Sequence, residues 1–87
     1  MVIALGNREY QFAEALVTLG GLRRANALKL FSDSRHPRQI LDRVENKFDE
    51  NIWCKREKYR GQVFYFPTET LLLIFSEMKI DSQYRGL

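Results

Sequence analysis

The stretch that decides the fold is IWCKREKYRGQVFYFP, residues 52–67. Residues that favour extended backbone (Ile, Trp, Val, Phe and Tyr) are concentrated in its two halves, 52–57 and 62–66. Between them lies the connection KYRG, residues 58–61, in which Gly61 can adopt the positive φ that a tight turn requires. The stretch therefore predicts a β-hairpin, which Pro67 ends.

Two helices are predicted at the start of the chain. The first spans about residues 8–19, and its apolar side chains recur at helical spacing: Phe12, Leu16 and Leu19. Asn7 is its predicted N-cap, and Gly20-Gly21 its stop signal. A shorter helix over about residues 23–31 follows.

A polar turn and a third helix separate these helices from the hairpin. Ser32, Asp33 and Ser34 favour a turn, because their side chains bond to nearby backbone groups. The third helix begins near His36 or Pro37, since proline is tolerated in a first helical turn, and residues 49–51 end it. Its inward-facing set is Ile40, Leu41, Val44 and Phe48.

A last helix is predicted after the hairpin, over about residues 69–80. Thr68 can cap it, and Glu69 is favoured in its first turn by the helix dipole. Residues 81–87 are predicted to be a polar tail. An 87-residue chain has room for one domain, here residues 1–80, and its class is α+β with mostly helix.

The net charge of +3 is concentrated in the middle of the chain. Residues 21–62 hold eleven bases and six acids, a local charge of +5, whereas residues 1–20 and 63–87 each carry −1. A basic middle between mildly acidic ends is typical of a surface that faces a polyanion. The alternative is a solvated surface on which lysine and arginine maintain solubility.

Several classes of protein and site are excluded by the same composition. Cys54 and His36 are each the one residue of their kind, so a single chain cannot build a disulfide, a zinc site or a catalytic triad from them. No glycine-rich phosphate loop is present. We therefore expect no enzymatic activity, no metal, no cofactor and no small-molecule ligand. The lone thiol, and the lack of an export signal or a membrane span of about 18 apolar residues, predict a cytoplasmic protein without membrane contact.

The predicted order of elements is similar to that of a known family of domains. Three stretches carry the similarity: ALVTLGGL (15–22) leading into the second helix, the SDS turn (32–34), and the basic hairpin KREKYRGQ (55–62) after the third helix. In these stretches the sequence resembles the winged helix-turn-helix domains of small prokaryotic transcription regulators. The resemblance covers about residues 12–67. It implies three helices, a β-hairpin wing and a C-terminal helix, in a protein that binds double-stranded DNA.

The resemblance also implies a reading surface on the third helix, which would lie in the major groove. Arg38 and Arg43 can each form a fork to guanine O6 and N7, and Gln39 or Asn46 can pair with adenine N6 and N7. The alternative for each side chain is a solvated helix face.

Contacts to the DNA backbone are implied for a second set of residues in the hairpin and at helix ends. These are Lys55, Arg56, Lys58, Tyr59 and Arg60 in the hairpin, Arg23 and Arg24 at the start of the second helix, and Arg35 and Lys47 near the ends of the third. The alternative is an edge hairpin whose charges only prevent aggregation.

The last helix predicts association of two copies of the chain. Residues 71–75 are apolar around the whole circumference, more than one face of a small core needs, and so short a chain gains stability from a partner subunit. The predicted homodimer interface consists of Leu71, Leu72, Ile74, Phe75 and Met78. A two-fold dimer would place its recognition helices about one DNA turn apart, on a pseudo-palindromic site. The alternative is that this helix covers the hairpin of its own domain.

Two other functions remain open at the level of the sequence. Asp42 and Glu45 put negative charge on the third helix, which suits a small adaptor that binds a basic protein on the same scaffold. Winged domains are also used to bind RNA.

Overall fold

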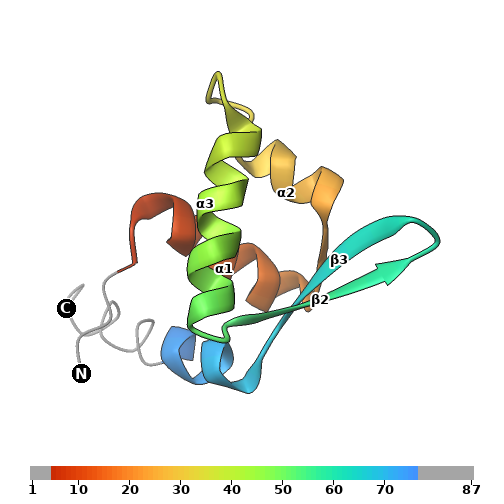
Figure 1. Cartoon of the computed structure of the whole chain (residues 1–87). Coiled ribbons are helices and arrows are strands. Elements are labelled where there is room, and N and C mark those ends of the chain that lie inside the picture. Colours follow the sequence, from red (N-terminus) through yellow and green to blue (C-terminus); the bar gives the residue numbers. More distant parts are fainter. Residues whose placement is uncertain (1–4, 77–87) are drawn as a thin grey trace.

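The computed structural model describes residues 5–76 of the 87-residue chain and has an α+β fold with more helix than strand (Figure 1). The elements in chain order are α1 (Asn7–Leu19), β1 (Leu22–Arg23), α2 (Arg24–Leu30), α3 (Pro37–Glu50), β2 (Cys54–Tyr59), β3 (Gln62–Pro67) and a helical segment over residues 69–76. The strands form one antiparallel sheet in the order β1-β3-β2. The predicted class, α+β with mostly helix, is confirmed.

Helix α1 ends as predicted but begins differently. Its N-cap is Gly6, with extended backbone and no capping side chain, so the predicted capping role of Asn7 is wrong. Gly20 adopts the left-handed conformation (φ 75°), and its N–H donates to the carbonyl of Leu16 at 2.9 Å. A β-carbon would be strained in that conformation, which is why a glycine ends the helix.

Strand β1 is absent from the sequence prediction, which starts the second helix at Arg23. Leu22 and Arg23 are instead extended, and they pair antiparallel with Tyr65 and Phe64 of β3. This pairing attaches the connection between α1 and α2 to the hairpin. Two residues are too few for an alternating pattern of polar and apolar side chains to reveal a strand.

The hairpin turn contains two residues, Arg60 and Gly61, rather than the four predicted. Both have positive φ, 50° and 77°, as in two-residue turns whose twist matches that of the flanking strands. The first strand begins at Cys54 and not at Ile52, because Ile52 itself has a positive φ (56°) in the turn after α3. Strands β2 and β3 pair along their whole length.

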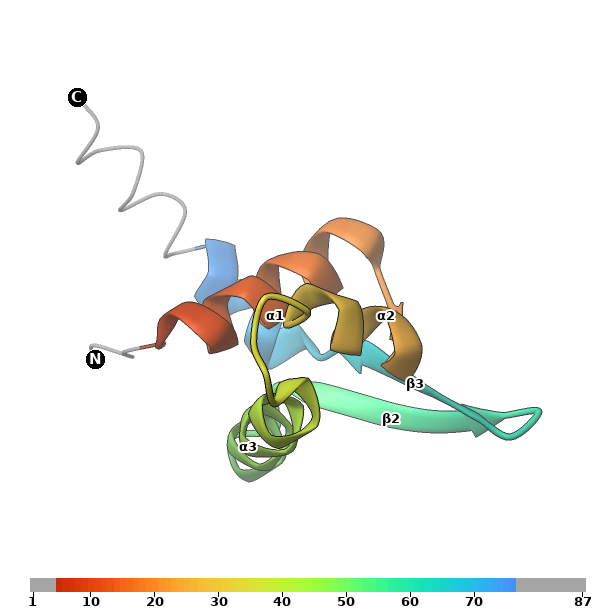
Figure 2. The same ribbon diagram turned by 90° about the horizontal axis from the view of Figure 1, so that it is seen from above.

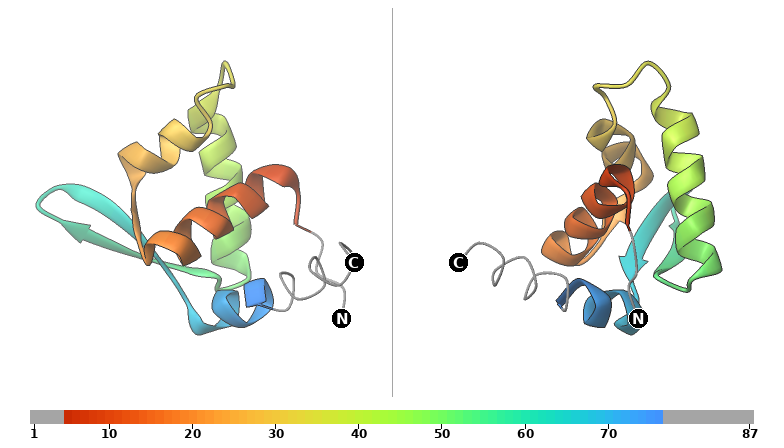
Figure 3. Two further views of the ribbon diagram at one scale, coloured as in Figure 1. Left: turned by 180° about the vertical axis from the view of Figure 1, so that it is seen from behind. Right: turned by 90° about the vertical axis from the view of Figure 1, so that its left-hand side faces the viewer.

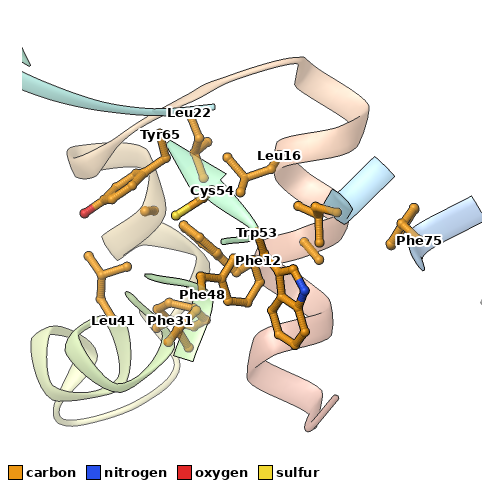
Figure 4. Close-up of a cluster of buried hydrophobic side chains, with 14 residues drawn as sticks. Phe12, Leu16, Leu22, Phe31, Leu41, Phe48, Trp53, Cys54, Tyr65 and Phe75 are labelled. Atoms are coloured by element: carbon orange, nitrogen blue, oxygen red, sulfur yellow. The ribbon is translucent and has the colours of Figure 1, made fainter. Parts of the chain in front are cut away.

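The core is built around a cluster of aromatic rings (Figure 4). Phe12 of α1 packs edge-on against Phe48 of α3, with centroids 5.0 Å apart, and against Tyr65 of β3 at 5.4 Å. Phe48 also contacts Trp53 at 5.3 Å. Edge-to-face pairs contribute about 0.5–1.5 kcal/mol each beyond their burial. The cluster therefore fixes α1, α3 and the hairpin relative to one another.

The helical segment 69–76 is attached to the connection between α3 and β2. The hydroxyl of Thr68 donates to the carbonyl of Ile52 at 2.7 Å and accepts from the N–H of Leu71 at 3.3 Å, so Thr68 caps this helix as predicted. Leu71 and Phe75 are buried in the core, 1% and 2% exposed. Residues 77–87, which include Met78 and the predicted tail, lie outside the described residues.

The elements divide the molecule into two sides. Helix α3 and the base of the hairpin lie on one side, and α1, α2 and the 69–76 segment lie on the other (Figures 2 and 3). The far end of the hairpin projects beyond the helices (Figure 1). Within residues 5–76, every helix is too short or too polar to cross a bilayer.

Candidate nucleic-acid interface

The four predicted base-reading residues lie together on the outer face of α3. Leu41, Val44 and Phe48 turn toward the core. With 3.6 residues per turn, this orientation leaves the opposite face to solvent. The exposed set contains every predicted reader: Arg38, Gln39, Arg43 and Asn46. Pro37 is the first helical residue, where its missing N–H costs no hydrogen bond.

Glu45, assigned from the sequence to a charged surface for a basic partner, is instead buried. Its side chain is 9% exposed, and it lies against the sheet. The guanidinium of Arg24 donates to Glu45 Oε1 at 2.6 Å and that of Arg56 to Oε2 at 3.2 Å. The hydroxyl of Tyr65 also donates to Oε1. One carboxylate thus links α3 to α2, β2 and β3.

This network keeps Tyr65 protonated and engages both arginines that contact Glu45. Burial, together with the neighbouring carboxylate, raises the pKa of Tyr65 far above its ordinary value, so its hydroxyl stays protonated as a donor. Arg24 also lies 3.7 Å from Asp42, and Arg56 lies 2.7 Å from Asp49. Arg24 and Arg56, predicted as phosphate contacts, are therefore held by carboxylates of α3.

Lys47 is likewise engaged within the fold. Its ammonium lies 3.0 Å from Glu9 Oε1, on α1. Burial alone would raise the pKa of Glu9, but the bonds from Lys47 and the backbone lower it overall. Lys47 thus connects α3 with α1, and a phosphate would have to compete with Glu9 for it.

The hairpin carries a cluster of exposed basic side chains. All of residues 55–60 are exposed, which includes Lys55, Lys58, Tyr59 and Arg60. The guanidinium of Arg60 lies 5.4 Å from the centre of the Tyr59 ring, within cation–π range. Lys55 lies 3.9 Å from Glu57, at the limit of an ion pair between two exposed side chains.

Arg23 and Arg35 are exposed at the margins of this surface. Arg23 of β1 lies 3.5 Å from Gln62 and beside a shallow depression between α2 and the hairpin. Arg35 belongs to the connection between α2 and α3, which Arg8 holds by donating to both carboxylate oxygens of Asp33 at 2.9 and 3.0 Å.

The charge of the two elements differs in sign. Helix α3 contains three bases and four acids, whereas residues 54–67 contain four bases and one acid. Of the four acids on α3, Glu45 is buried, and Asp42 and Asp49 lie within 4 Å of an arginine. The basic character inferred from the middle of the chain therefore resides in the hairpin and in residues 21–36, which also contain four bases and one acid, and not in α3.

The predicted dimer surface is only partly exposed. Leu71 and Phe75, assigned to it from the sequence, are core residues of their own chain, so their assignment is wrong. Leu72 is 43% exposed and Ile74 is half-buried. Leu73, 68% exposed and not assigned to the interface, lies next to them.

The side chains considered for catalysis take structural places. His36 is exposed and precedes α3 as its N-cap residue. Cys54 is buried, and burial in the first place raises its pKa to about 11, so its thiol is a poor nucleophile. Among residues 5–76, no three His, Cys, Asp or Glu side chains are grouped so as to hold a metal ion.

Two features of this surface were missed in the sequence. The inward turn of Glu45 depends on partners 11 to 21 residues away, so no local pattern reveals it. Phe64 and Phe66 share a sheet face with Tyr59, which strict alternation along the strands could have shown. Comparisons of the sequence with protein-family models, with curated proteins and with solved structures returned no match.

Proposed function

We propose that this protein binds double-stranded DNA as a small transcription regulator with a winged helix-turn-helix fold. In this proposal α2 and α3 form the helix-turn-helix, and β2 and β3 form the wing. One observation carries it: α3 and the hairpin lie on the same side of the molecule (Figure 2), and the polar side chains of α3 and the basic side chains of the hairpin are exposed. A duplex can meet both at once.

Helix α3 would read bases in the major groove. Its 14 residues make a rod about 20 Å long, enough to cross a groove about 12 Å wide. Gln39, Arg43 and Asn46 follow at i, i+4 and i+7, so they form one row along the groove. Arg43 forms a fork to guanine, and the two amides suit adenine.

The wing would hold the sugar-phosphate backbone. Arg60 lies in the hairpin turn, Lys58 lies two residues before it, and both are exposed, whereas Arg56 is occupied by Glu45 and Asp49. With about four to five phosphate contacts in all, the logarithm of affinity should fall with that of salt with a slope of about −4.

A fluorescence-anisotropy titration with random-sequence duplex DNA at about 50 and 200 mM salt tests this function. Arg60→Ala should weaken binding to all sequences alike and reduce the salt slope by about one. Lys29→Ala is the matched control, because Lys29 is exposed on α2, outside the proposed surface, and the substitution removes the same charge. An affinity that is absent, independent of salt, or lowered equally by both variants contradicts the proposal.

Arg43→Ala tests direct reading of bases. Selection of bound sequences from a random pool should then lose preference at one base position, at a cost of about 1–3 kcal/mol for the preferred site. An unchanged preference removes Arg43 from base recognition.

The active form in this proposal is a homodimer that uses the exposed part of the 69–76 segment, Leu72 and Leu73. The two recognition helices would then face half-sites about 34 Å apart, in a pseudo-palindrome. Selected sites that show a single half-site contradict the dimeric form.

A second candidate function rests on the three exposed acids of α3. Asp42, Asp49 and Glu50 are exposed and could face a basic protein instead of DNA. Asp42→Asn and Glu50→Gln separate the two functions, because they should strengthen binding to a polyanion and weaken binding to a basic partner. Duplex RNA in the same titration distinguishes RNA from DNA as the polyanion.

A further inference from the structure

The outward face of the sheet carries two phenylalanines, Phe64 and Phe66, that the proposed duplex contacts do not use, and Tyr59 lies beside them. Residues paired across antiparallel strands point to the same face, and the register pairs Lys55 with Phe66, Glu57 with Phe64, Tyr59 with Gln62 and Arg23 with Phe64. We call this set the aromatic sheet face: Arg23, Lys55, Glu57, Tyr59, Gln62, Phe64 and Phe66.

This face points away from α3. The neighbouring pair in the ladder, Arg56 and Tyr65, lies on the opposite face, and both side chains reach Glu45 of α3. Side chains alternate between the two faces of a strand. A molecule on the aromatic sheet face and a duplex on α3 would therefore contact different sides of the hairpin.

The rings of this face form a fixed platform. Phe64 and Phe66 are stacked, with centroids 6.4 Å apart and planes 18° from parallel, and with Tyr59 and Glu57 they line a shallow depression. The ring of Phe66 lies so close to Gly21 that a β-carbon there would be 2.9 Å from it. Tyr59 is 61% exposed and both phenylalanines are partly exposed, so the rings are accessible.

Positive charge surrounds the rings. Arg23 and Lys55 flank the phenylalanines on β1 and β2, and the guanidinium of Arg60 stands over Tyr59. Glu57 is the one acid of the set, and Lys55 lies 3.9 Å from it. Aromatic planes bordered by cations match a partner that combines flat apolar rings with negative charge. Two copies of the same face would instead bring like charges together.

We propose that the aromatic sheet face binds single-stranded nucleic acid, whose bases stack on Tyr59 and Phe64 while Arg23 and Lys55 hold its phosphates. Stacking does not depend on base identity, so the binding should tolerate any sequence. The strands are about 20 Å long, enough for about three stacked or splayed nucleotides. The proposal goes beyond duplex binding and does not depend on it, because Phe64 and Phe66 lie outside the duplex surface and α3 lies outside this face. Arg23, Lys55 and Tyr59 belong to this face and also to the implied backbone contacts.

An anisotropy titration of the full chain with a short labelled oligothymidine tests the proposal. Tyr59→Leu and Phe64→Leu should each weaken binding about five-fold or more, because each removes a stacking plane and keeps an apolar side chain. Tyr59→Leu lies at an exposed position, so it keeps the test valid even if Phe64→Leu reduces folding, which circular dichroism reports. Arg38→Ala on α3 is the control and should leave single-strand binding unchanged while it weakens duplex binding.

The outcomes distinguish this proposal from the preceding one. Weaker single-strand binding by both leucine variants, with the duplex affinity of Phe64→Leu retained and an ultraviolet cross-link from the oligonucleotide to β2 or β3, supports it. Any of three results overturns it. The first is no single-strand binding at about 50 mM salt, and the second is wild-type affinity of Tyr59→Leu for the oligonucleotide. The third is conversion of a dimer to a monomer by Tyr59→Leu, which would assign the face to a second copy of the chain. A loss of duplex binding in Arg38→Ala alone, or a complete absence of duplex binding, bears on the proposed function. Neither outcome changes the conclusion drawn from single-strand binding.

Discussion

Replacement of Glu45 by alanine should destabilise the fold more than that of any exposed acid on the same helix. The change leaves the hydroxyl of Tyr65 without its carboxylate acceptor and removes a common partner of Arg24 and Arg56. An unsatisfied buried donor costs about 1–3 kcal/mol. The arginine side chains are 39% and 46% exposed, so water can solvate them, and each lost pair adds at most about 1 kcal/mol. We expect the free energy of unfolding to fall by about 2–4 kcal/mol.

Urea denaturation followed by the fluorescence of Trp53 measures this loss. Trp53 is buried against Phe48, at the end of α3, so its emission should report global unfolding. For a small domain with a slope of about 1–1.5 kcal/mol per molar urea, the midpoint should fall by about 1–4 M. Glu45→Gln keeps one acceptor oxygen and should fall between Glu45→Ala and the wild type.

Glu50→Ala is the matched control, because it removes a carboxylate from α3 that is exposed. Such surface changes usually alter stability by no more than about 0.5 kcal/mol. If Glu45→Ala unfolds at the same urea concentration as Glu50→Ala, the carboxylate does not hold the hairpin to α3, and the reasoning is refuted.

Four further substitutions or treatments have defined outcomes. Because the pKa of Cys54 is raised to about 11, about one thousandth of its thiol is ionised at pH 8, and a thiol reagent should react slowly until urea is added; rapid reaction of the folded chain contradicts this. The same raised pKa means that stability is fully present below about pH 9, the unfolded value, and falls as the pH rises to about 11, which thermal melts at each pH would show. Gly21→Ala places a β-carbon 2.9 Å from the ring of Phe66 and should cost about 1–3 kcal/mol, whereas an unchanged melting temperature means that the ring moves aside freely. Leu72→Asp together with Leu73→Asp should convert a dimer to a monomer in sedimentation, and a wild-type chain that is already monomeric would remove the dimer from the proposal.

Local signals in the sequence predicted the helices and the hairpin well. Gly20 and Pro37 mark helix ends because each residue's own backbone preference determines the local conformation. The spacing of apolar residues in α3 correctly predicted that Arg38 and Arg43 face outward. The predicted connection had four residues, whereas the turn has two, Arg60 and Gly61. Lys58 and Tyr59 were assigned to the connection because a charged residue in an exposed strand cannot be distinguished by type from one in a loop.

Features that depend on distant partners were not predictable in this way. Strand β1 exists because Leu22 and Arg23 meet β3, more than 40 residues later in the chain. The burial of Glu45 requires Arg24 and Tyr65, 21 and 20 residues away. When only neighbouring residues are considered, the sequence predicts an exposed carboxylate at this position. The same network engages Arg24 and Arg56, which the sequence analysis assigned to DNA contacts.

The two-residue turn at Arg60 and Gly61 has a consequence for how this hairpin can evolve. Substitutions can alter the side chains of either face without disturbing the alternation that separates the two faces. A single inserted residue in β3 would instead turn Phe64 toward α3 and Tyr65 toward solvent, since side chains change sides at every position. Divergence of the hairpin should therefore proceed by exchange of side chains, with changes of strand length tolerated only in steps of two.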